Sequence, residues 1–262
     1  MTEPKQPTTH QPSDHLFEHQ TPFEQPADRP VYVVIPAAGS GSRMGAGRNK
    51  QFLEVGGLPL IIRTLMAFEQ SPEISGYVVV TSREDSEAMA ILIQRFDLRK
   101  LIALADGGMT RQDSVLSGLR KIIELRKDAS QSIALVHDGA RCFVSGEIIR
   151  RCIDALRTSK NGGCGAAVPV KDTIKVVDPD GRIEQTLDRS RLWAMQTPQG
   201  ADFQVLLAAY EQLEASGQQV TDDLAVLEAV GQPTFLVSGE YTNIKMTTPE
   251  DLVIGEALVI TR

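Results

Sequence analysis

The 262-residue sequence lacks several features that would assign it to a familiar class of protein. Its three cysteines, Cys142, Cys152 and Cys164, are spaced ten and twelve residues apart and form neither a C-x-x-C pair nor a disulfide framework. We therefore expect buried thiols in a reducing compartment. No apolar run approaches the roughly 18–20 residues that a membrane span requires, so we expect no membrane partner.

Positively charged residues are also fewer than negatively charged ones. The chain has 27 Lys and Arg residues against 34 Asp and Glu residues, a formal net charge of −7. Binding to nucleic acid without sequence preference needs a basic face that displaces phosphate counterions, so we expect no nucleic-acid partner. A small phosphorylated substrate remains compatible with this balance, because a few cations in one cleft can oppose the average charge.

Residues 1–30 differ in composition from the rest of the chain. They hold six of the 14 prolines, only five hydrophobic residues and a net charge of −3. Such a segment buries too little apolar surface to offset the entropy lost on ordering. We predict a disordered, Pro-rich tail over 1–30 and one folded domain over 31–262. The tail resembles neither a secretory signal nor a transit peptide. We expect a cytoplasmic protein, or a plastid one if a leader has been removed.

The remaining sequence alternates short apolar runs with helical patterns. The runs predict buried strands at 31–35, 77–80, 101–104, 133–136 and 166–168, separated by helices at 60–68, 84–97, 115–125 and 146–157. This order predicts an α/β fold with a Rossmann-like, mostly parallel sheet that helices cover on both faces. Ligands of such sheets bind at the carboxyl ends of the strands, near a switch in strand order. The loops that follow the strands are therefore the expected place for the site.

The alternation ends at 173–189. Residues 173–177 and 182–187 flank the turn sequence Asp178-Pro-Asp-Gly181 and predict a β-hairpin. A lone two-stranded hairpin is marginal in water, so we expect this arm to pack on another surface, such as a second subunit. Beyond the arm we expect helices near 202–214, over 222–230 and from Pro249, and strands at 234–237 and 242–246.

The loop after the first strand carries the strongest functional signal. It reads PAAGSGSRMGAGRNKQ and places Arg43, Arg48 and Lys50 in a run of small residues. Small residues let backbone N–H groups approach an anion closely. Two common phosphate loops do not fit, because Met44 stands where the dinucleotide fingerprint needs glycine and the chain has no Gly-Lys pair. We interpret the loop as a triphosphate cradle; the alternative is a surface loop with solvated cations.

This loop, from Pro36 to Met44 and then Lys50-Gln-Phe-Leu, resembles the signature loop of sugar-phosphate nucleotidyltransferases, and in particular the 2-C-methyl-D-erythritol 4-phosphate cytidylyltransferase family. Further blocks match in the family's order and cover nearly all of 31–258: Asp106-Gly-Gly, Arg111-Gln-Asp-Ser-Val-Leu-Ser-Gly118, Val136-His-Asp-Gly-Ala-Arg141, Pro169-Val-Lys-Asp-Thr173, Asp188-Arg189, Trp193, Gln196-Thr-Pro-Gln199, Thr221-Asp222 and Asn243-Ile-Lys-Met-Thr247. The resemblance implies the nucleotide-diphospho-sugar transferase type of fold. It also implies transfer of the cytidylyl group of CTP to methylerythritol 4-phosphate in isoprenoid precursor biosynthesis, with release of pyrophosphate.

The resemblance also implies roles for residues at matching positions. The catalytic residues would be Arg43 and Lys50 on the triphosphate, and Arg189 and Lys245 on the polyol phosphate. The residues that bind CTP would be Ala37, Ala38, Gly39, Gly41, Gly108 and Ser114. The residues that bind the polyol phosphate would be Asp138, Arg141, Thr173 and Thr221.

Several of these residues also have an ordinary structural interpretation. Gly108 fits a strand-to-helix turn, Ser114 a helix start, Asp138 a turn or cap, Lys245 a surface charge and Thr221 a helix N-cap. The histidine next to Asp138 is a tempting general base. We expect it to be a packed core residue instead, because the attacking phosphate oxygen is already ionised near pH 7.

The resemblance implies a cofactor and a partner as well. Mg²⁺ is the expected divalent cation, held mainly through the CTP phosphates, and no protein ligand for it can be named. The family's arm reaches across a homodimer, so Arg189 and Thr173 would serve the partner's active site. Four positions depart from the family pattern without removing a required charge: Asn49, Gly139, Cys142 and Asp223.

Two other functions remain open at this point. One is a cytidylyltransferase that acts on another polyol phosphate, such as ribitol 5-phosphate. The other is a non-catalytic nucleotide-sensing or scaffold protein, since a fold does not determine a function.

Overall fold

The computed structural model describes residues 29–39, 49–158 and 162–261. The expected tail lies outside the described residues, except for Arg29 and Pro30. These two residues contact the folded unit. Arg29 Nη2 lies 2.6 Å from Asp202 Oδ1, and the Pro30 carbonyl accepts a hydrogen bond from the N–H of Ile133 at 2.9 Å.

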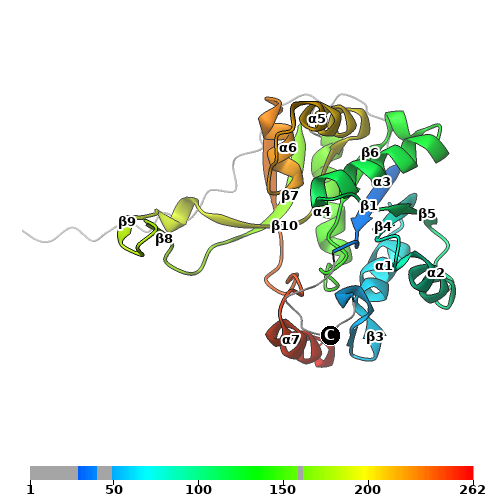
Figure 1. Cartoon of the computed structure of the whole chain (residues 1–262), viewed down its shortest axis with the longest axis horizontal. Helices are drawn as coiled ribbons and strands as arrows, with labels where there is room; N and C mark the ends of the chain where they lie inside the picture. The colour runs from blue at the N-terminus through cyan, green and yellow to red at the C-terminus, as the bar shows by residue number, and fades with distance from the viewer. Residues whose placement is uncertain (1–28, 40–48, 159–161, 262) are drawn as a thin grey trace, which may run out of the picture.

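A seven-stranded sheet forms the centre of the molecule (Figure 1). Its order is β11-β7-β10-β6-β1-β4-β5, with β1 (Val31–Pro36), β4 (Gly76–Thr81), β5 (Leu101–Asp106), β6 (Ile133–Val136), β7 (Gly163–Pro169), β10 (Trp193–Asp202) and β11 (Thr234–Ser238). Neighbouring strands are parallel except where β10 pairs with β6 and β7. The expected α/β class and mostly parallel sheet are confirmed.

Two layers of helices cover the sheet, because successive residues of a strand point to opposite faces. Val33 and Ile35 of β1 pack in the cluster that α1 (Leu60–Gln70), α2 (Ser86–Gln94) and α4 (Gly146–Thr158) complete. Tyr32 and Val34 face the cluster formed with α3 (Arg111–Leu125), α5 (Phe203–Ser216) and α6 (Asp223–Ala229). The continuous apolar runs of the sequence thus correspond to strands buried on both faces.

Two segments differ from the expectation. Strand β10 was not foreseen, because its buried part includes Gln196, Thr197 and Gln199 rather than an apolar run. The strand expected at 242–246 does not form, since residues 241–247 are turn and loop. Lys245 therefore lies on a loop rather than at the end of a strand.

A smaller unit packs below the carboxyl edge of the sheet. Strand β2 (Glu54–Val55) and helix α7 (Pro249–Ile260) share an apolar cluster with Phe143 and Met246, and β3 (Leu58–Pro59) pairs with β2. Helix α7 begins as expected, with Thr248 and Asp251 forming a capping box. No helix in the described ranges is long and apolar enough to cross a bilayer.

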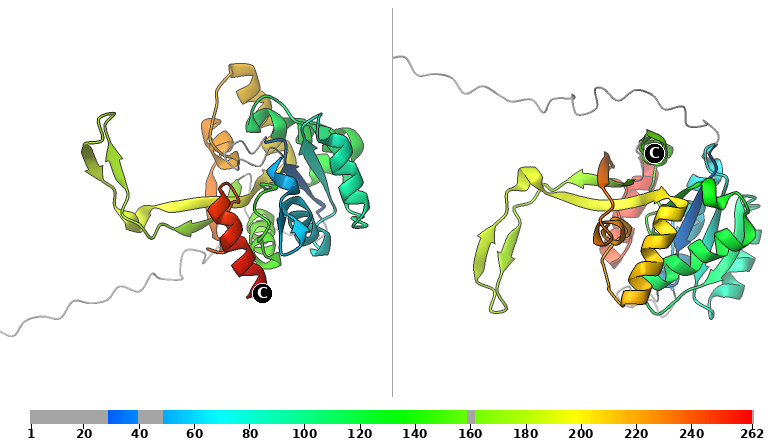
Figure 2. Two further views of the ribbon diagram at one scale, coloured as in Figure 1. Left: turned by 60° about the horizontal axis from the view of Figure 1, so that its bottom comes forward. Right: turned by 90° about the horizontal axis from the view of Figure 1, so that it is seen from above.

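The expected hairpin is present and projects from the body as a long arm (Figure 2). Its strands are β8 (Lys175–Val177) and β9 (Ile183–Thr186), and every residue of both is exposed. The exposed side chains include Val176, Val177 and Ile183. The arm therefore presents apolar surface that the body of its own chain does not cover.

Candidate active site

A cavity of about 280 Å³ opens where the strand order reverses. The chain passes from β1 to β4 and β5 on one side, then returns to β6 on the other side of β1. Open α/β sheets bind ligands at such a reversal. The cavity is lined by residues that follow β1, β5 and β6 and by two other loops: Pro36, Ala38, Gly39, Lys50, Gln51, Gly108, Met109, Thr110, Arg111, Ser114, Asp138, Gly139, Ala140 and Lys245.

Small residues form one wall of the cavity, where the loops after β1 and β5 meet. A Cβ atom on Gly107 would lie 2.5 Å from the Cβ of Ala38, so only glycine permits this approach. Ser114 Oγ accepts a hydrogen bond from the N–H of Gly108 at 3.1 Å and donates to the Thr110 carbonyl at 2.9 Å. This wall therefore lacks large side chains, and the hydrogen bonds of Ser114 hold it to the start of α3.

Two of the expected nucleotide-binding alanines occupy different positions. Ala38 lines the cavity, but Ala37 is buried beneath it and donates its N–H to the Val80 carbonyl at 2.7 Å. Gly39 lines the cavity as well. The expected Gly41 and Arg43 lie outside the described residues.

Lys50 begins a single 3-10 turn, η2 (Lys50–Phe52), that Asn49 caps. The Asn49 Oδ1 accepts the N–H of Gln51 at 3.1 Å, and its Nδ2 donates to Asp85 Oδ2 at 2.8 Å. Lys50 lines the cavity, and its Nζ donates to the Met246 carbonyl at 3.2 Å. The asparagine that departs from the family pattern thus fastens the lysine-bearing turn to the body.

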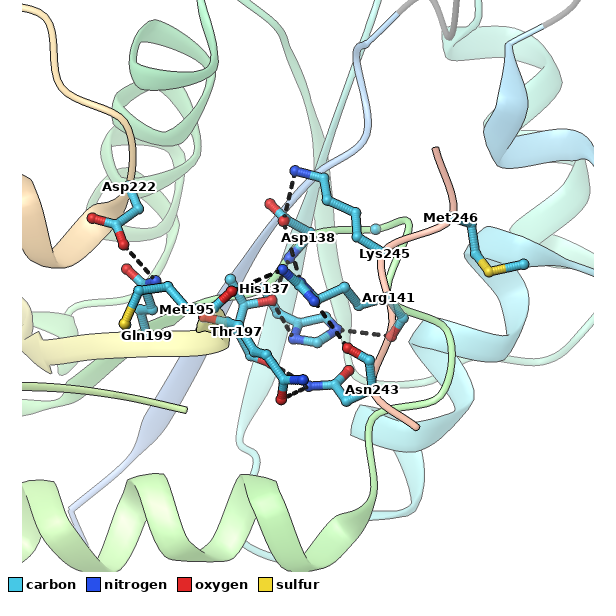
Figure 3. Close-up of polar contacts among 12 residues, drawn as sticks. His137, Asp138, Arg141, Met195, Thr197, Gln199, Asp222, Asn243, Lys245 and Met246 are labelled. Carbon is cyan, nitrogen blue, oxygen red and sulfur yellow. Dashed lines mark hydrogen bonds and ion pairs between the residues drawn. The ribbon is translucent and has the colours of Figure 1, made fainter. Parts of the chain in front are cut away.

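Asp138 lies at the centre of the polar contacts (Figure 3). Its Oδ2 lies 2.9 Å from Lys245 Nζ and 3.6 Å from Arg141 Nε, and its Oδ1 accepts from Arg111 Nε at 3.1 Å. Burial alone would raise the pKa of Asp138, but the charges of Arg111, Lys245 and Arg141 outweigh it and hold that pKa well below its usual range. Asp138 is therefore ionised at neutral pH.

The loop that carries Lys245 is fastened to the loop after β6. Arg141 donates from Nη1 to the Asn243 carbonyl at 2.9 Å and from Nη2 to the Met195 carbonyl at 3.2 Å. The N–H of Met246 donates to the Ala140 carbonyl at 2.9 Å. These contacts bring Lys245 to Asp138 across about a hundred residues of sequence. Arg141 supports the carboxylate but does not line the cavity.

His137 is fully buried, which confirms that it is a packed residue. Its Nε2 lies 3.1 Å from the Arg141 carbonyl, which can only accept, so Nε2 carries the proton. Nδ1 then accepts from Thr197 Oγ1 at 3.0 Å, and that oxygen accepts the N–H of Asp138 at 3.1 Å. Burial lowers the pKa of His137 to about 4, so the ring is neutral at pH 7.

Three of the expected site residues lie away from the cavity. Thr173 and Arg189 are exposed on the arm, and Arg189 Nη1 donates to the Lys171 carbonyl at 2.7 Å. Thr221 is exposed just before α6, whose N-cap is Asp222 and not Thr221. Within the cavity, the structure brings together Ala38, Gly39, Lys50, Gly108, Ser114, Asp138 and Lys245.

Sequence reasoning gave no role to several residues that shape the site. Arg111 could have been found from the sequence, because it follows Gly107 and Gly108 in the loop after β5, at the carboxyl edge of the sheet. Thr197 lies in the matching block Gln196-Thr-Pro-Gln199 but was given no role of its own. Tyr210 had no signal, since nothing local distinguishes it from an ordinary core residue. Within the described part of the chain, no group of three or more His, Cys, Asp or Glu side chains could hold a metal ion.

Comparisons with known proteins agree with this geometry. The family model of 2-C-methyl-D-erythritol 4-phosphate cytidylyltransferase matches residues 31–261. Curated proteins of that name from Microcystis aeruginosa and Geobacillus thermodenitrificans are 45% and 43% identical to the chain. Each alignment covers 88% of this chain, with 100% and 97% of the respective relatives. The crystal structure of 4-diphosphocytidyl-2C-methyl-D-erythritol synthase from Anaerococcus prevotii superposes with a TM-score of 0.76 at 32% identity, covering 89% of this chain and 97% of that one. The chain therefore belongs to the 2-C-methyl-D-erythritol 4-phosphate cytidylyltransferase family.

Proposed function

We propose that this chain transfers the cytidylyl group of CTP to 2-C-methyl-D-erythritol 4-phosphate. The products are 4-diphosphocytidyl-2-C-methyl-D-erythritol and pyrophosphate, and the reaction serves isoprenoid precursor biosynthesis. The observation that supports this most strongly is the cavity at the strand-order reversal, where Lys245 and Arg111 contact one carboxylate and Lys50 lines the same space beside a wall of glycine and alanine.

The proposed reaction needs no general base. An ionised phosphate oxygen of the substrate attacks the α-phosphorus of CTP. The bond from that phosphorus to the oxygen that bridges to the β-phosphorus breaks, and its electron pair leaves with pyrophosphate. Both reacting groups are anionic, so the protein contributes mainly positioning and charge neutralisation.

The cavity residues fit these two tasks. The narrow wall of Ala38, Gly39 and Gly108 suits a flat pyrimidine and leaves little room for a purine. Lys50 would neutralise the triphosphate, and the family pattern assigns Arg43 to the same task. Lys245 would meet the polyol phosphate, while the ionised Asp138 would accept hydrogen bonds from the substrate hydroxyls. Ala37, Gly41 and Ser114 would support the nucleotide through their backbone or loop contacts.

The donor set also fits a magnesium ion shared with the substrate. Asp138 is the single carboxylate among the described residues that line the cavity. Mg²⁺ in such sites uses one or two carboxylates together with substrate phosphates. When bound, the ion would neutralise charge on the phosphates. Asp138 would be the residue that contacts it, while Lys50 and Lys245 would contribute to the same neutralisation of charge.

We further propose that the protein is a homodimer with shared active sites. Arg189 and Thr173 lie on the projecting arm and do not line the cavity of their own chain. The exposed apolar side chains of the arm need a covering surface, which a second copy would supply. In this arrangement, the arm of one subunit would bring Arg189 and Thr173 to the polyol phosphate of the other. The three buried thiols support a reducing compartment such as the cytoplasm.

A direct test measures pyrophosphate release from CTP and Mg²⁺. Methylerythritol 4-phosphate and ribitol 5-phosphate are offered in parallel reactions, with UTP replacing CTP as the nucleotide control. We expect release only with CTP and the methylerythritol substrate. Release only with ribitol 5-phosphate would overturn the polyol assignment and leave the nucleotide assignment intact. CTP binding without release for either polyol would instead favour a nucleotide-sensing protein.

A further inference from the structure

A second carboxylate, Asp223, lies completely buried behind the cavity at the start of α6. Both of its oxygens accept from the guanidinium of Arg111, with Nη1–Oδ1 at 2.9 Å and Nη2–Oδ2 at 2.7 Å. The hydroxyl of Tyr210, on α5, donates to the same Oδ1. Two parallel bonds between a guanidinium and a carboxylate determine the plane of both groups.

Asp223 is itself held in place by the central sheet. The N–H groups of Asp223 and Leu224 both donate to Gln199 Oε1, each at 2.9 Å. The Nε2 of the same glutamine donates at 3.0 Å to Oδ2 of Asp222, the N-cap residue of α6, whose Oδ1 accepts the N–H of Ala225. The backbone at Asp223 is therefore held by β10, independently of the guanidinium that the carboxylate contacts.

Arg111 does not stabilise α3, the helix that carries it. Arg111 is the first residue of α3, where the positive end of the helix dipole disfavours a cation. Thr110 and Asp113 already cap this helix. Arg111 instead reaches both ways: its terminal nitrogens contact buried Asp223, and its Nε contacts Asp138 in the cavity at 3.1 Å.

Asp138 thereby has a different cation on each of its oxygens. Oδ1 accepts from Arg111, and Oδ2 accepts from Lys245 at 2.9 Å. With Arg141 included, the cluster holds three cations against Asp138 and Asp223, which leaves one net positive charge. That excess positive charge favours an incoming phosphate. The Asp138 side chain must keep its rotation for Lys245 to remain in position.

We propose that Asp223 and Tyr210 are positioning residues that orient Arg111, which in turn holds the Asp138 carboxylate in the rotation that presents Lys245 to the substrate phosphate. This inference rests on the proposed function, because it concerns groups that would meet the polyol phosphate. Neither Asp223 nor Tyr210 touches the cavity, so both act only through Arg111.

The first test is Asp223→Asn, which keeps the size of the side chain and turns an amide N–H toward the guanidinium. A displaced carboxylate in the cavity should lower kcat by about tenfold to a hundredfold. The KM for the polyol phosphate should rise while the KM for CTP changes little, because the cytidine wall is untouched. Tyr210→Phe retains the paired bonds to Arg111 and should give a smaller effect in the same direction.

Two further variants separate positioning from folding. Arg111→Met combined with Asp223→Leu replaces the buried pair with apolar side chains, a change that often preserves stability. We expect a thermal midpoint at or above that of Asp223→Asn, but a kcat that stays low because Asp138 still lacks its Nε donor. The matched control is Glu214→Gln, which breaks the two-bond Arg120–Glu214 pair between α3 and α5 on the surface. This control should keep the wild-type kcat and both KM values.

Wild-type kcat in the doubly apolar variant would overturn the inference, because the buried pair would then serve folding alone. A kcat that merely follows the thermal midpoint across all four variants would overturn it as well. An inactive wild type would refute the proposed function and this inference together. An active wild type with unaffected variants would refute the inference alone.

Discussion

The cavity and the arm differ in how their residues are held. Around the cavity, Asp138, His137 and Lys245 contact partners about 60 to 110 residues away in the sequence. In the arm, the hydrogen bonds of β8 and β9 join residues within one hairpin, and all seven residues of the two strands are exposed. The contacts that hold these cavity residues thus lie within one chain, whereas the arm presents exposed apolar surface that the proposed dimer would cover.

The largest effect should come from the cavity. Lys50→Ala removes a preorganised donor at the triphosphate and should raise the barrier by roughly 3–4 kcal/mol, a fall in kcat of at least about a hundredfold. Steady-state pyrophosphate release measures it. Lys121→Ala, which removes a helix-surface lysine paired with Glu124, is the control and should change nothing. A loss below about tenfold would remove Lys50 from the catalytic residues.

Substitutions in the arm should affect dimer formation and not the folding of the chain. Ile183→Asp places a charge in the exposed apolar surface of β9 and should convert the proposed dimer into monomers, as sedimentation velocity would show. The thermal midpoint of the body should change little, because this residue contacts no core cluster. Glu184→Gln, on the neighbouring position of the same strand, should leave the dimer intact. A monomeric wild type would contradict the proposal.

Shared sites predict complementation between the two regions. Arg189→Ala disables the arm of a chain, and Lys50→Ala disables its cavity. Subunits exchanged between the two inactive variants should regain up to about one functional site per mixed dimer, measured as kcat after mixing. No recovery, despite proven subunit exchange, would show that Arg189 does not act across the interface.

A smaller effect should appear in the pH dependence of stability. The pKa of His137 is lowered to about 4 in the folded chain. An unfolded histidine takes up its proton near pH 6.5, so the stability contributed by this group is full above that pH and lost as the pH falls toward 4. Between pH 6.5 and 5, the wild type should lose about 2 kcal/mol more unfolding free energy than His137→Gln. Denaturant titrations at each pH measure these free energies. An equal change of unfolding free energy with pH in both proteins would show that His137 does not titrate in this way.

The smallest effect should come from removing an N-cap side chain, and two such residues can be compared, one beside the cavity and one in the arm. Asn49 caps η2 beside the cavity, and Asp188 caps η4 (Arg189–Arg191) at the base of the arm. Asn49→Ala should cost about 1 kcal/mol of stability, because it also removes the bond to Asp85. It should also lower kcat through Lys50. Asp188→Ala is exposed and should leave the unfolding transition unchanged. Equal changes in urea unfolding would contradict this distinction.

Local pattern predicted most of the fold and part of the site. Val31 to Ile35 was predictable as a buried strand because β-branched residues favour that backbone, and the capping residues of α7 marked the start of a helix. The glycine loops indicated where an anion would bind. The buried strand β10 escaped this reasoning, because polar Gln196 and Gln199 are compatible with burial only when their partners are in place.

The sequence by itself determined the layered α/β architecture, the position of the cavity at the ends of the strands and the projecting arm, since all three depend on periodicity, turn residues and glycine. Only the tertiary structure decided that Asp138 lies between Arg111 and Lys245, that His137 is neutral and that Asp223 anchors the guanidinium. The physical reason is that these properties depend on burial and on charges within about 4 Å, and residues remote in the chain supply both.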